Sequence, residues 1–240
     1  MTKRKRVSAT KLDILKVVSR IFLEKGYTAT TSRMICEELE ISTGNLTYHF
    51  PTKEHILAVL VELLCEFQDE MMEQSIDEGK TSLMALCMEL TAMAAICEES
   101  DKMRDFYLSA YTHPMSMEII RRNDKARAKE IFGEYCEGWE ERNYREAETL
   151  VSGIEFATLM TTDSSAALDV RIAGALGGIM MIYNVPEELR KKKIGKALAM
   201  DYRAVGRRIL GEFCEYIENI DEKTMERILR KKEEDTKSEK

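Results

Sequence analysis

The stretch of sequence that decides the fold covers residues 21–57 and reads IFLEKGYTATTSRMICEELEISTGNLTYHFPTKEHIL. Its apolar residues recur at helical spacing, and the polar residues between them are of the types that begin and end helices. Gly26 suits the left-handed end of a first helix, whose apolar stripe starts at Leu15. Thr30 or Thr31 can then cap a short second helix.

The second half of this stretch predicts another short helix. Ser42 or Thr43 can cap it, and Pro51 stops it after Phe50. Two short helices joined by a tight turn form a helix-turn-helix. Its core is expected to consist of Ile35, Leu39, Ile41, Leu46 and Phe50. The later helix would then expose side chains suited to the major groove of DNA, namely Thr43, Asn45, Thr47 and Tyr48.

In its particular residues the stretch resembles the N-terminal domain of TetR-family transcriptional regulators. The matching positions are Phe22, Gly26, Tyr27, Thr30, Ile35, Ile41, Ser42, Thr43, Gly44, Leu46, Tyr48, His49, Phe50, Lys53 and Glu54. The resemblance implies a homodimer in which each subunit places one recognition helix in the major groove of a palindromic operator. It also implies a larger C-terminal domain that binds a small molecule and dimerises.

Carried over by position, the resemblance implies a set of DNA-contacting residues. Thr43 and Asn45 are implied to contact bases, and Gly44 to let the backbone approach closely. The residues implied to contact phosphates are Thr31, Thr47, Tyr48, His49 and Lys53. Three residues depart from the family pattern. Thr47 replaces a common aromatic residue, Glu40 stands where glycine is frequent, and His55 replaces a capping-box glutamate.

Helical spacing continues through the rest of the chain, which therefore belongs to the all-α class. Thr52 can cap a long helix that starts at Lys53 and runs toward Met71. The helices predicted after it cover residues 81–98, 102–112, 115–141, 145–160, 165–183 and 187–217. We expect a helix-turn-helix DNA-binding domain over residues 1–55, a helical effector-binding and dimerisation domain over residues 56–220, and a charged, frayed tail over residues 221–240.

The charge distribution supports this division. The chain has 240 residues and a net charge of −7, but residues 1–55 hold ten Lys/Arg and six Asp/Glu residues, which leaves −11 for the remainder. A basic end indicates contact with a polyanion. The cluster at residues 3–6 either adds salt-dependent affinity, enters a minor groove or is a solvated arm. The longest uncharged apolar stretch is shorter than the ~20 residues of a membrane span, so we expect a cytoplasmic protein without membrane contact.

Two C-terminal helices are candidates for a dimer interface. The span 165–183 contains small residues that let helices pack closely: Ala173, Gly174, Ala175, Gly177 and Gly178. The span 187–217 carries an apolar seam at helical spacing, formed by Ile194, Leu198, Tyr202, Val205, Ile209 and Phe213. A protein that binds a palindrome needs a two-fold axis, so we expect these helices between subunits. The alternative is a helix pair within one chain.

The central helices are expected to enclose a pocket. The candidates for ligand contact are Met88, Phe106, Tyr111, His113 and Trp139. Such polarizable and aromatic residues would suit an apolar or aromatic small-molecule effector. The alternative is that these residues belong to the core, since amphipathic helices need apolar stripes in any case.

Motifs for catalysis, metal binding or cofactor binding are absent from the sequence. The three histidines are dispersed, and there is no H-E-x-x-H motif, cysteine pair, nucleophile elbow or phosphate-binding loop. We therefore expect no enzymatic activity, no metal site and no cofactor. The six scattered cysteines are interpreted as reduced.

Together these features predict a ligand-responsive, one-component transcriptional regulator. It would be a repressor that binds a palindromic, double-stranded DNA operator as a homodimer and responds to a small-molecule effector. One alternative is an all-α metabolite-binding or protein-interaction module without sequence-specific DNA binding. A second keeps DNA binding but replaces the small effector by a protein partner, and a missing cavity would favour it.

Overall fold

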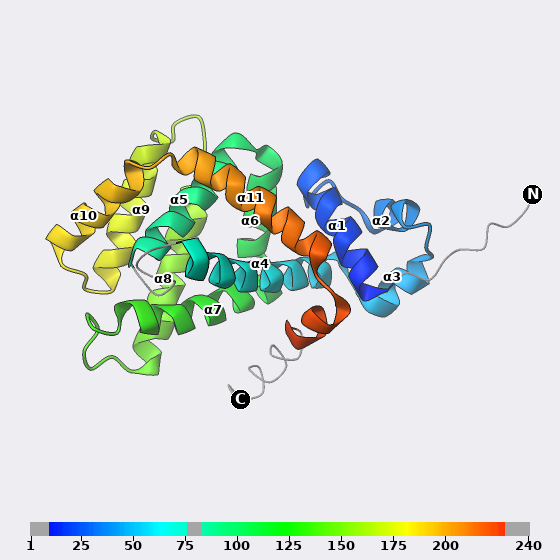
Figure 1. Cartoon of the computed structure of the whole chain (residues 1–240), viewed down its shortest axis with the longest axis horizontal. Helices are drawn as coiled ribbons and strands as arrows, with labels where there is room; N and C mark the ends of the chain where they lie inside the picture. The colour runs from blue at the N-terminus through cyan, green and yellow to red at the C-terminus, as the bar shows by residue number, and fades with distance from the viewer. Residues whose placement is uncertain (1–9, 76–82, 229–240) are drawn as a thin grey trace, which may run out of the picture.

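The computed structural model describes residues 10–75 and 83–228, with the backbone alone for residues 69–75. The basic cluster at residues 3–6 lies outside the described residues. Regular structure in the described ranges is helical, without a strand, which confirms the all-α class. Three helices form a small group at one end of the molecule, and the others build a larger body beside it (Figure 1). Among the described helices, none is long and apolar enough to cross a membrane.

The three N-terminal helices begin at capping residues. They are α1 (Lys11–Lys25), α2 (Ser32–Glu38) and α3 (Thr43–His49). Thr10 caps α1 in a capping box, in which its hydroxyl accepts from the backbone N–H of Asp13 and the Asp13 carboxylate accepts from the N–H of Thr10. Thr31 caps α2 and Ser42 caps α3, so each helix start satisfies a backbone N–H that would otherwise lack a partner.

The turns of this domain use two positive φ angles. Gly26 ends α1 at φ +88°, and Glu40 joins α2 to α3 at φ +53°. Glu40 thus adopts the left-handed conformation that explains why glycine is frequent at this turn position. The helix-turn-helix core is confirmed for Ile35, Ile41, Leu46 and Phe50, which are buried, while Leu39 is half-buried against them.

The larger body contains the remaining labelled helices. They are α4 (Lys53–Ser75), α5 (Leu83–Glu99), α6 (Asp101–Thr112), α7 (Pro114–Phe132), α8 (Glu141–Leu159), α9 (Leu168–Ile182), α10 (Glu187–Leu198) and α11 (Tyr202–Asn219). In Figure 1, α11 runs from the far end of the body back toward α1. α5 packs against α6, α8, α9, α10 and α11, so it lies at the centre of the body.

α4 links the two domains and packs along α7. A buried ion pair joins these helices, because Arg122 Nη2 donates to Glu62 Oε1 at 2.6 Å. The two side chains are only 12% and 8% exposed. Removing one partner from such a pair costs about 3–5 kcal/mol, since the other charge is left buried and uncompensated. The position of α4 is therefore tied to that of α7.

Helix boundaries differ from the sequence-based prediction at several places, and α8 begins at Glu141 rather than at residue 145. The predicted helix over residues 115–141 ends at Phe132, and a tight turn that includes Gly138 at φ +78° precedes α8. The predicted helix over residues 187–217 is broken after Leu198, because the Asp201 side chain accepts from the N–H of Ala204 and caps α11. α9 begins at residue 168 rather than 165. Apolar periodicity persists across such breaks, so it did not reveal them.

The apolar seam over residues 194–213 faces the core of the same chain. Ile209 and Phe213 of α11 are buried. At Gly206 an added Cβ would lie only 3.0 Å from the carbonyl oxygen of Ala92 on α5, so the two backbones are in close contact. Ile209 and Phe213 thus form a helix contact within one chain, which is the alternative expected from the sequence, whereas Ile194, Leu198, Tyr202 and Val205 are half-buried.

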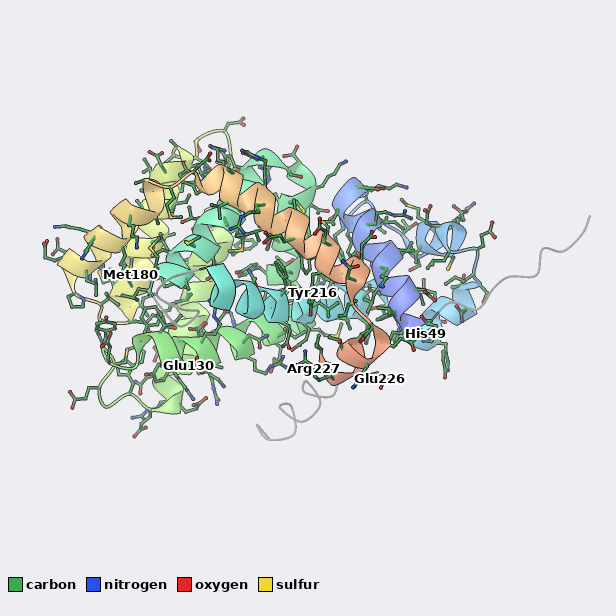
Figure 2. All side chains as sticks on the ribbon, viewed as in Figure 1. His49, Glu130, Met180, Tyr216, Glu226 and Arg227 are labelled. Atoms are coloured by element: carbon green, nitrogen blue, oxygen red, sulfur yellow. The ribbon has the colours of Figure 1, made fainter. Side chains whose placement is uncertain are left out.

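The start of the C-terminal tail is also packed. Residues 222–228 are helical, and Met225 and Ile228 are buried. Arg227 pairs with Glu66 of α4 at 3.0 Å. Figure 2 shows Glu226 and Arg227 on this last described turn, below α4. The expectation of a frayed tail is thus wrong for residues 222–228, and residues 229–240 lie outside the described residues.

Candidate nucleic-acid interface and ligand cavity

The outer side of α3 is the candidate nucleic-acid interface. Leu46 anchors the inner side of this helix in the core. The predicted contact residues on α3 that are exposed are Thr43, Gly44, Thr47 and Tyr48, and those that are half-buried are Asn45 and His49. Figure 2 shows His49 in the N-terminal domain and Met180 near the far end of the helical body. The six residues are thus brought together on one short helix.

Gly44 and Thr47 differ in how they can contact a partner. An added Cβ at Gly44 would meet only Ser42 Oγ, at 3.8 Å, so the fold itself does not require glycine there. Thr47 Oγ1 donates to the carbonyl oxygen of Thr43 at 3.0 Å. Its hydroxyl hydrogen is therefore used within the helix. A phosphate contact by Thr47 would require the hydroxyl to rotate.

Tyr48 is 82% exposed. Among the described residues, it is the one aromatic side chain in the set of large apolar side chains that are exposed. Its ring contacts the ring of His49 edge-on, with the centroids 5.0 Å apart. A tyrosine combines an apolar ring with a hydroxyl donor, which suits contact with the sugar and phosphate of a nucleic acid. The geometry keeps both side chains on the outer face.

Thr31 and Lys53 flank α3, and both already make hydrogen bonds within the protein. Thr31 Oγ1 accepts from the N–H of Met34 at 3.3 Å, which leaves its hydroxyl hydrogen for a phosphate. Lys53 Nζ donates to the carbonyl oxygens of Tyr27 and Thr30, both at 2.9 Å. Burial lowers the pKa of Lys53. These hydrogen bonds use two of the three donors of the ammonium, which also lies 4.1 Å from the centroid of the Tyr27 ring.

The loop between α1 and α2 joins this interface to the helical body. Asp105 of α6 accepts hydrogen bonds from the N–H of Thr28 at 2.8 Å and from its hydroxyl at 2.5 Å. Gly26 permits this approach, because an added Cβ would lie 2.8 Å from Asp105 Oδ2. His113, at the corner between α6 and α7, packs edge-on against Tyr27 with ring centroids 5.3 Å apart. A displacement of α6 would therefore act directly on the helix-turn-helix.

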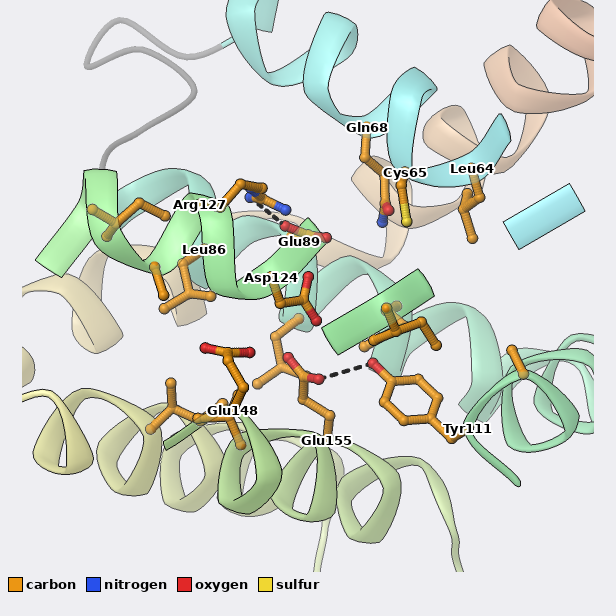
Figure 3. A pocket seen from close by; sticks show the side chains of 18 of the residues that line it. Leu64, Cys65, Gln68, Leu86, Glu89, Tyr111, Asp124, Arg127, Glu148 and Glu155 are labelled. Atoms are coloured by element: carbon orange, nitrogen blue, oxygen red, sulfur yellow. Dashed lines mark hydrogen bonds and ion pairs between the residues drawn. The ribbon is translucent and has the colours of Figure 1, made fainter. Parts of the chain in front are cut away.

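A cavity lies within the helical body, between α4, α5, α6, α7 and α8 (Figure 3). Its volume is about 70 Å³, well above the roughly 10–15 Å³ that one buried water needs. Most of its wall is apolar or aromatic and includes Leu64, Leu90, Met93, Tyr107, Ile120, Phe132, Val151 and Tyr183. Apolar walls with a few polar groups are typical of small-molecule sites.

Several ionisable side chains line the same cavity. They are Glu89, Asp124, Arg127, Glu148 and Glu155. Arg127 and Glu89 form an ion pair at 2.6 Å without hydrogen-bond geometry. Tyr111 donates its hydroxyl hydrogen to Glu155 Oε2 at 2.9 Å, and Tyr183 donates to Glu148 Oε1. Figure 3 shows the carboxylates of Asp124, Glu148 and Glu155 turned toward the same space.

Burial raises the pKa of three of these carboxyl groups. Burial and repulsion from neighbouring carboxylates raise the pKa of Asp124 well above its usual range. Burial raises the pKa of Glu148 to about 7 and that of Glu155 to about 8, although the tyrosine hydrogen bonds act in the opposite direction. A carboxyl group in such surroundings holds its proton near neutral pH unless a positive charge comes close.

The structure places one of the five predicted ligand-pocket residues, Tyr111, on this cavity. Met88 lies in a separate small pocket beside Met200 and Val205. The other three lie elsewhere: Phe106 is buried against Tyr107, His113 lies at the domain junction, and Trp139 packs against Tyr144. Helical periodicity indicates which residues are buried, but it does not indicate which of several spaces they face.

Sequence reasoning missed the acidic residues of the cavity, although α8 contained a signal for them. Its inward stripe comprises Tyr144, Glu148, Val151, Glu155 and Leu159, at steps of four, three, four and four. Carboxylates in an otherwise apolar stripe are rarely buried without a reason. Within residues 10–75 and 83–228, no group of three His, Cys, Asp or Glu side chains is arranged to hold a metal ion.

Comparison with known proteins identifies the N-terminal domain. Residues 14–60 match the family model described as bacterial regulatory proteins, tetR family. A segment of 122 residues, 51% of this chain, is 27% identical to 52% of the HTH-type transcriptional regulator HbdR of Aromatoleum sp.. A segment of 50 residues, 21% of this chain, is 42% identical to 27% of the HTH-type transcriptional regulator QacR of Staphylococcus aureus. The matches thus span about half and about a quarter of these relatives.

Two solved structures are similar over most of their length. A gamma-butyrolactone receptor described as ArpA-like is 15% identical with a TM-score of 0.43, and the match covers 85% of this chain and 97% of the receptor. AmtR of Mycobacterium smegmatis is 17% identical with a TM-score of 0.38, and the match covers 83% and 99% of the two chains.

Proposed function

This chain belongs to the TetR family of bacterial regulatory proteins, and from that premise we propose that it is a ligand-responsive repressor that binds a palindromic operator as a homodimer. The observation that carries the proposal is the surface of α3, which exposes polar and aromatic residues around a glycine that the fold does not require. Thr43 and Asn45 would contact base edges in the major groove, and Thr31, Thr47, Tyr48, His49 and Lys53 would contact phosphates. Such a repressor acts in the cytoplasm, where its operator lies.

An exposed apolar face on α8 and α9 supports the proposed homodimer. Leu150 of α8 and Met160, directly after this helix, are 54% and 53% exposed, and Val170 and Met181 of α9 are 58% and 61% exposed. Gly174 lies between the latter two along α9 and has open space around it. Exposed apolar side chains on adjacent helices are candidates for an interface. We therefore favour the small residues of α9 for the dimer contact over the seam of α11, whose Ile209 and Phe213 pack within the same chain.

The position of the cavity supports regulation by a small molecule. Tyr107 and Tyr111 of α6 line it, and Asp105 of the same helix holds Thr28 of the helix-turn-helix. α4 also lines the cavity and leads directly from α3. A ligand that shifts α6 or α4 would change the separation of the two recognition helices, which must match half-sites about 34–36 Å apart. The presence of a cavity favours a small effector over a protein partner.

The proposal is tested by selecting DNA from a random pool at near-physiological salt. We expect an enriched inverted repeat, and we expect Asn45→Ala to abolish the enrichment because the residue lies on the recognition helix. Glu24→Gln, an exposed change on α1, is the matched control and should select the same repeat. If the folded protein enriches no motif, the alternative of a metabolite-binding or protein-interaction module is correct.

A further inference from the structure

The cavity in the helical body is lined by more carboxyl groups than positively charged groups. Arg127 is paired with Glu89. In the part of the chain that the structure describes, Asp124, Glu148 and Glu155 form no ion pair with a lysine or arginine. Glu148 and Glu155 are only 3% and 8% exposed. Ionising buried carboxyl groups without a paired positive charge is unfavourable. Arg121, Lys125 and Arg127 lower the pKa of Glu148 only in part, so a cation that enters the cavity would meet carboxyl groups that its charge can ionise.

Each of the two α8 carboxylates has one oxygen held by the protein and one left over. Tyr111 donates to Glu155 Oε2, and Tyr183 donates to Glu148 Oε1. The second oxygens, Glu155 Oε1 and Glu148 Oε2, accept no hydrogen bond from the described residues. Figure 3 shows both carboxylates reaching into the cavity, with Asp124 of α7 opposite them. The tyrosines thus fix the carboxylates in an orientation that leaves acceptors for a ligand.

The spacing of these carboxylates suits a cation with an organic body. Glu148 and Glu155 are two helical turns apart, which corresponds to about 10.5 Å along α8. Val151 lies between them, and Phe132 and Tyr183 stack face to face nearby with centroids 4.0 Å apart. Aromatic faces attract organic cations, and apolar side chains accommodate their bodies.

We propose that this cavity binds an organic cation, an ammonium or amidinium group carried on an apolar or aromatic body, with Asp124, Glu148 and Glu155 as its counter-charges. This cation is the effector of the proposed repressor, so its regulatory role rests on the proposed function, whereas its binding does not. The aromatic body agrees with the effector expected from the sequence, and the positive charge is the new element.

Binding of such a cation is coupled to proton release. The ionisable groups that face the three carboxyls are Cys65 from α4, Glu89 from α5, Tyr107 and Tyr111 from α6, Arg121, Lys125 and Arg127 from α7, and Tyr183 after α9. Burial raises the pKa of Glu148 to about 7 and that of Glu155 to about 8, so both hold protons part of the time at pH 7. A cation favours the ionised form, and its affinity should rise between pH 6 and pH 8 as protons leave more easily.

The binding test uses calorimetry on the full chain without DNA. Benzamidine is compared with its neutral analogue benzamide, and 2-phenylethylamine with 2-phenylethanol. We expect at least one cation to bind about tenfold or more tightly than its neutral analogue, with a binding enthalpy that depends on the buffer because protons are released. Equal affinities within both pairs, tighter binding of benzoate, or binding of Zn²⁺ or Mg²⁺ alone would overturn the proposal.

Variants test whether the preference for a cation over its neutral analogue depends on Asp124 and Glu155. Glu155→Gln keeps an oxygen acceptor for Tyr111, and Asp124→Asn removes no hydrogen bond made by the described residues. Each is expected to reduce cation affinity about tenfold and to leave the affinity for the neutral analogue unchanged. Glu146→Gln, an exposed change on the same helix α8, is the matched control. If one of the two variants fails to fold, the other one tests the proposal. A folded variant that prefers the cation over its neutral analogue as strongly as the unsubstituted protein contradicts the proposal.

Operator binding separates this proposal from the proposed function. Cation binding that releases a selected operator supports both. Cation binding by a protein that enriches no DNA motif supports the cation site and overturns the repressor. An enriched operator, together with no preference for either cation over its neutral analogue, overturns the cation site and leaves the repressor standing.

Discussion

At Gly44 the chain leaves room for a partner. An added Cβ would meet only Ser42 Oγ, at 3.8 Å, and alanine is favoured over glycine within a helix by about 0.5–1 kcal/mol. We therefore expect Gly44→Ala to raise the free energy of unfolding slightly and yet to weaken operator binding about tenfold or more, because the methyl group would occupy the space needed by DNA. Urea denaturation and operator titration measure the two effects.

Gly211→Ala provides the control for this prediction. Gly211 is an exposed residue of α11 with open space around it, so the substitution should raise stability similarly without changing the affinity for DNA. If Gly44→Ala bound the operator as tightly as the unsubstituted protein, a close approach of DNA at this residue would be ruled out.

At the scale of the helices, the exposed apolar side chains on and beside α8 and α9 are the proposed site of assembly. Met181 is 61% exposed, so Met181→Glu should not disturb folding of the subunit. Placed in a two-fold interface, the two new carboxylates would lie close together and repel each other. We expect a folded monomer in sedimentation experiments and a loss of operator affinity of about tenfold or more, since a single subunit contacts one half-site.

The matched change for this prediction is Met115→Glu, at an exposed methionine on the first turn of α7. It should leave the protein dimeric. A dimer that persists in Met181→Glu at micromolar concentration would place the subunit interface on another face of the molecule.

At the scale of the whole molecule, the buried carboxyls predict how stability depends on pH. Their pKa values are raised in the folded protein, to about 7 for Glu148 and about 8 for Glu155. The folded state therefore holds protons that the unfolded chain releases above about pH 4.5. It follows that the contribution of these two carboxyls to the free energy of unfolding is fully present below that pH and is lost as the pH rises toward 8.

This decrease can be followed by calorimetry. We expect the Tm to be several degrees lower at pH 8.5 than at pH 5.5, since each kcal/mol shifts the Tm of a chain of this size by roughly 2–4 °C. Glu155→Gln should flatten the decrease, whereas Glu146→Gln should not. A Tm profile in Glu155→Gln that parallels that of the unsubstituted protein would show that Glu155 does not hold a proton in the folded state.

Local sequence determined the elements of the helix-turn-helix, because its caps and turns depend on residues within a few positions of one another. Thr31 and Ser42 cap the predicted helices, and Glu40 has the left-handed turn conformation expected at its position. In the helical body, the periodicity of apolar residues was less informative. It gave no indication that Asp201 would start a new helix, or that the seam ending at Phe213 would pack against α5.

The sequence by itself determined that this protein is all-α, since that follows from short-range patterns of apolar, capping and turn residues, and its resemblance to TetR-family regulators identified the DNA-binding domain. Only the tertiary structure decided the composition of the cavity. Asp124 and Glu155 are 31 positions apart and lie on different helices, and their approach depends on how those helices pack. Burial, ion pairing and the raised pKa values are properties of that packing, and none of them exists for either residue alone.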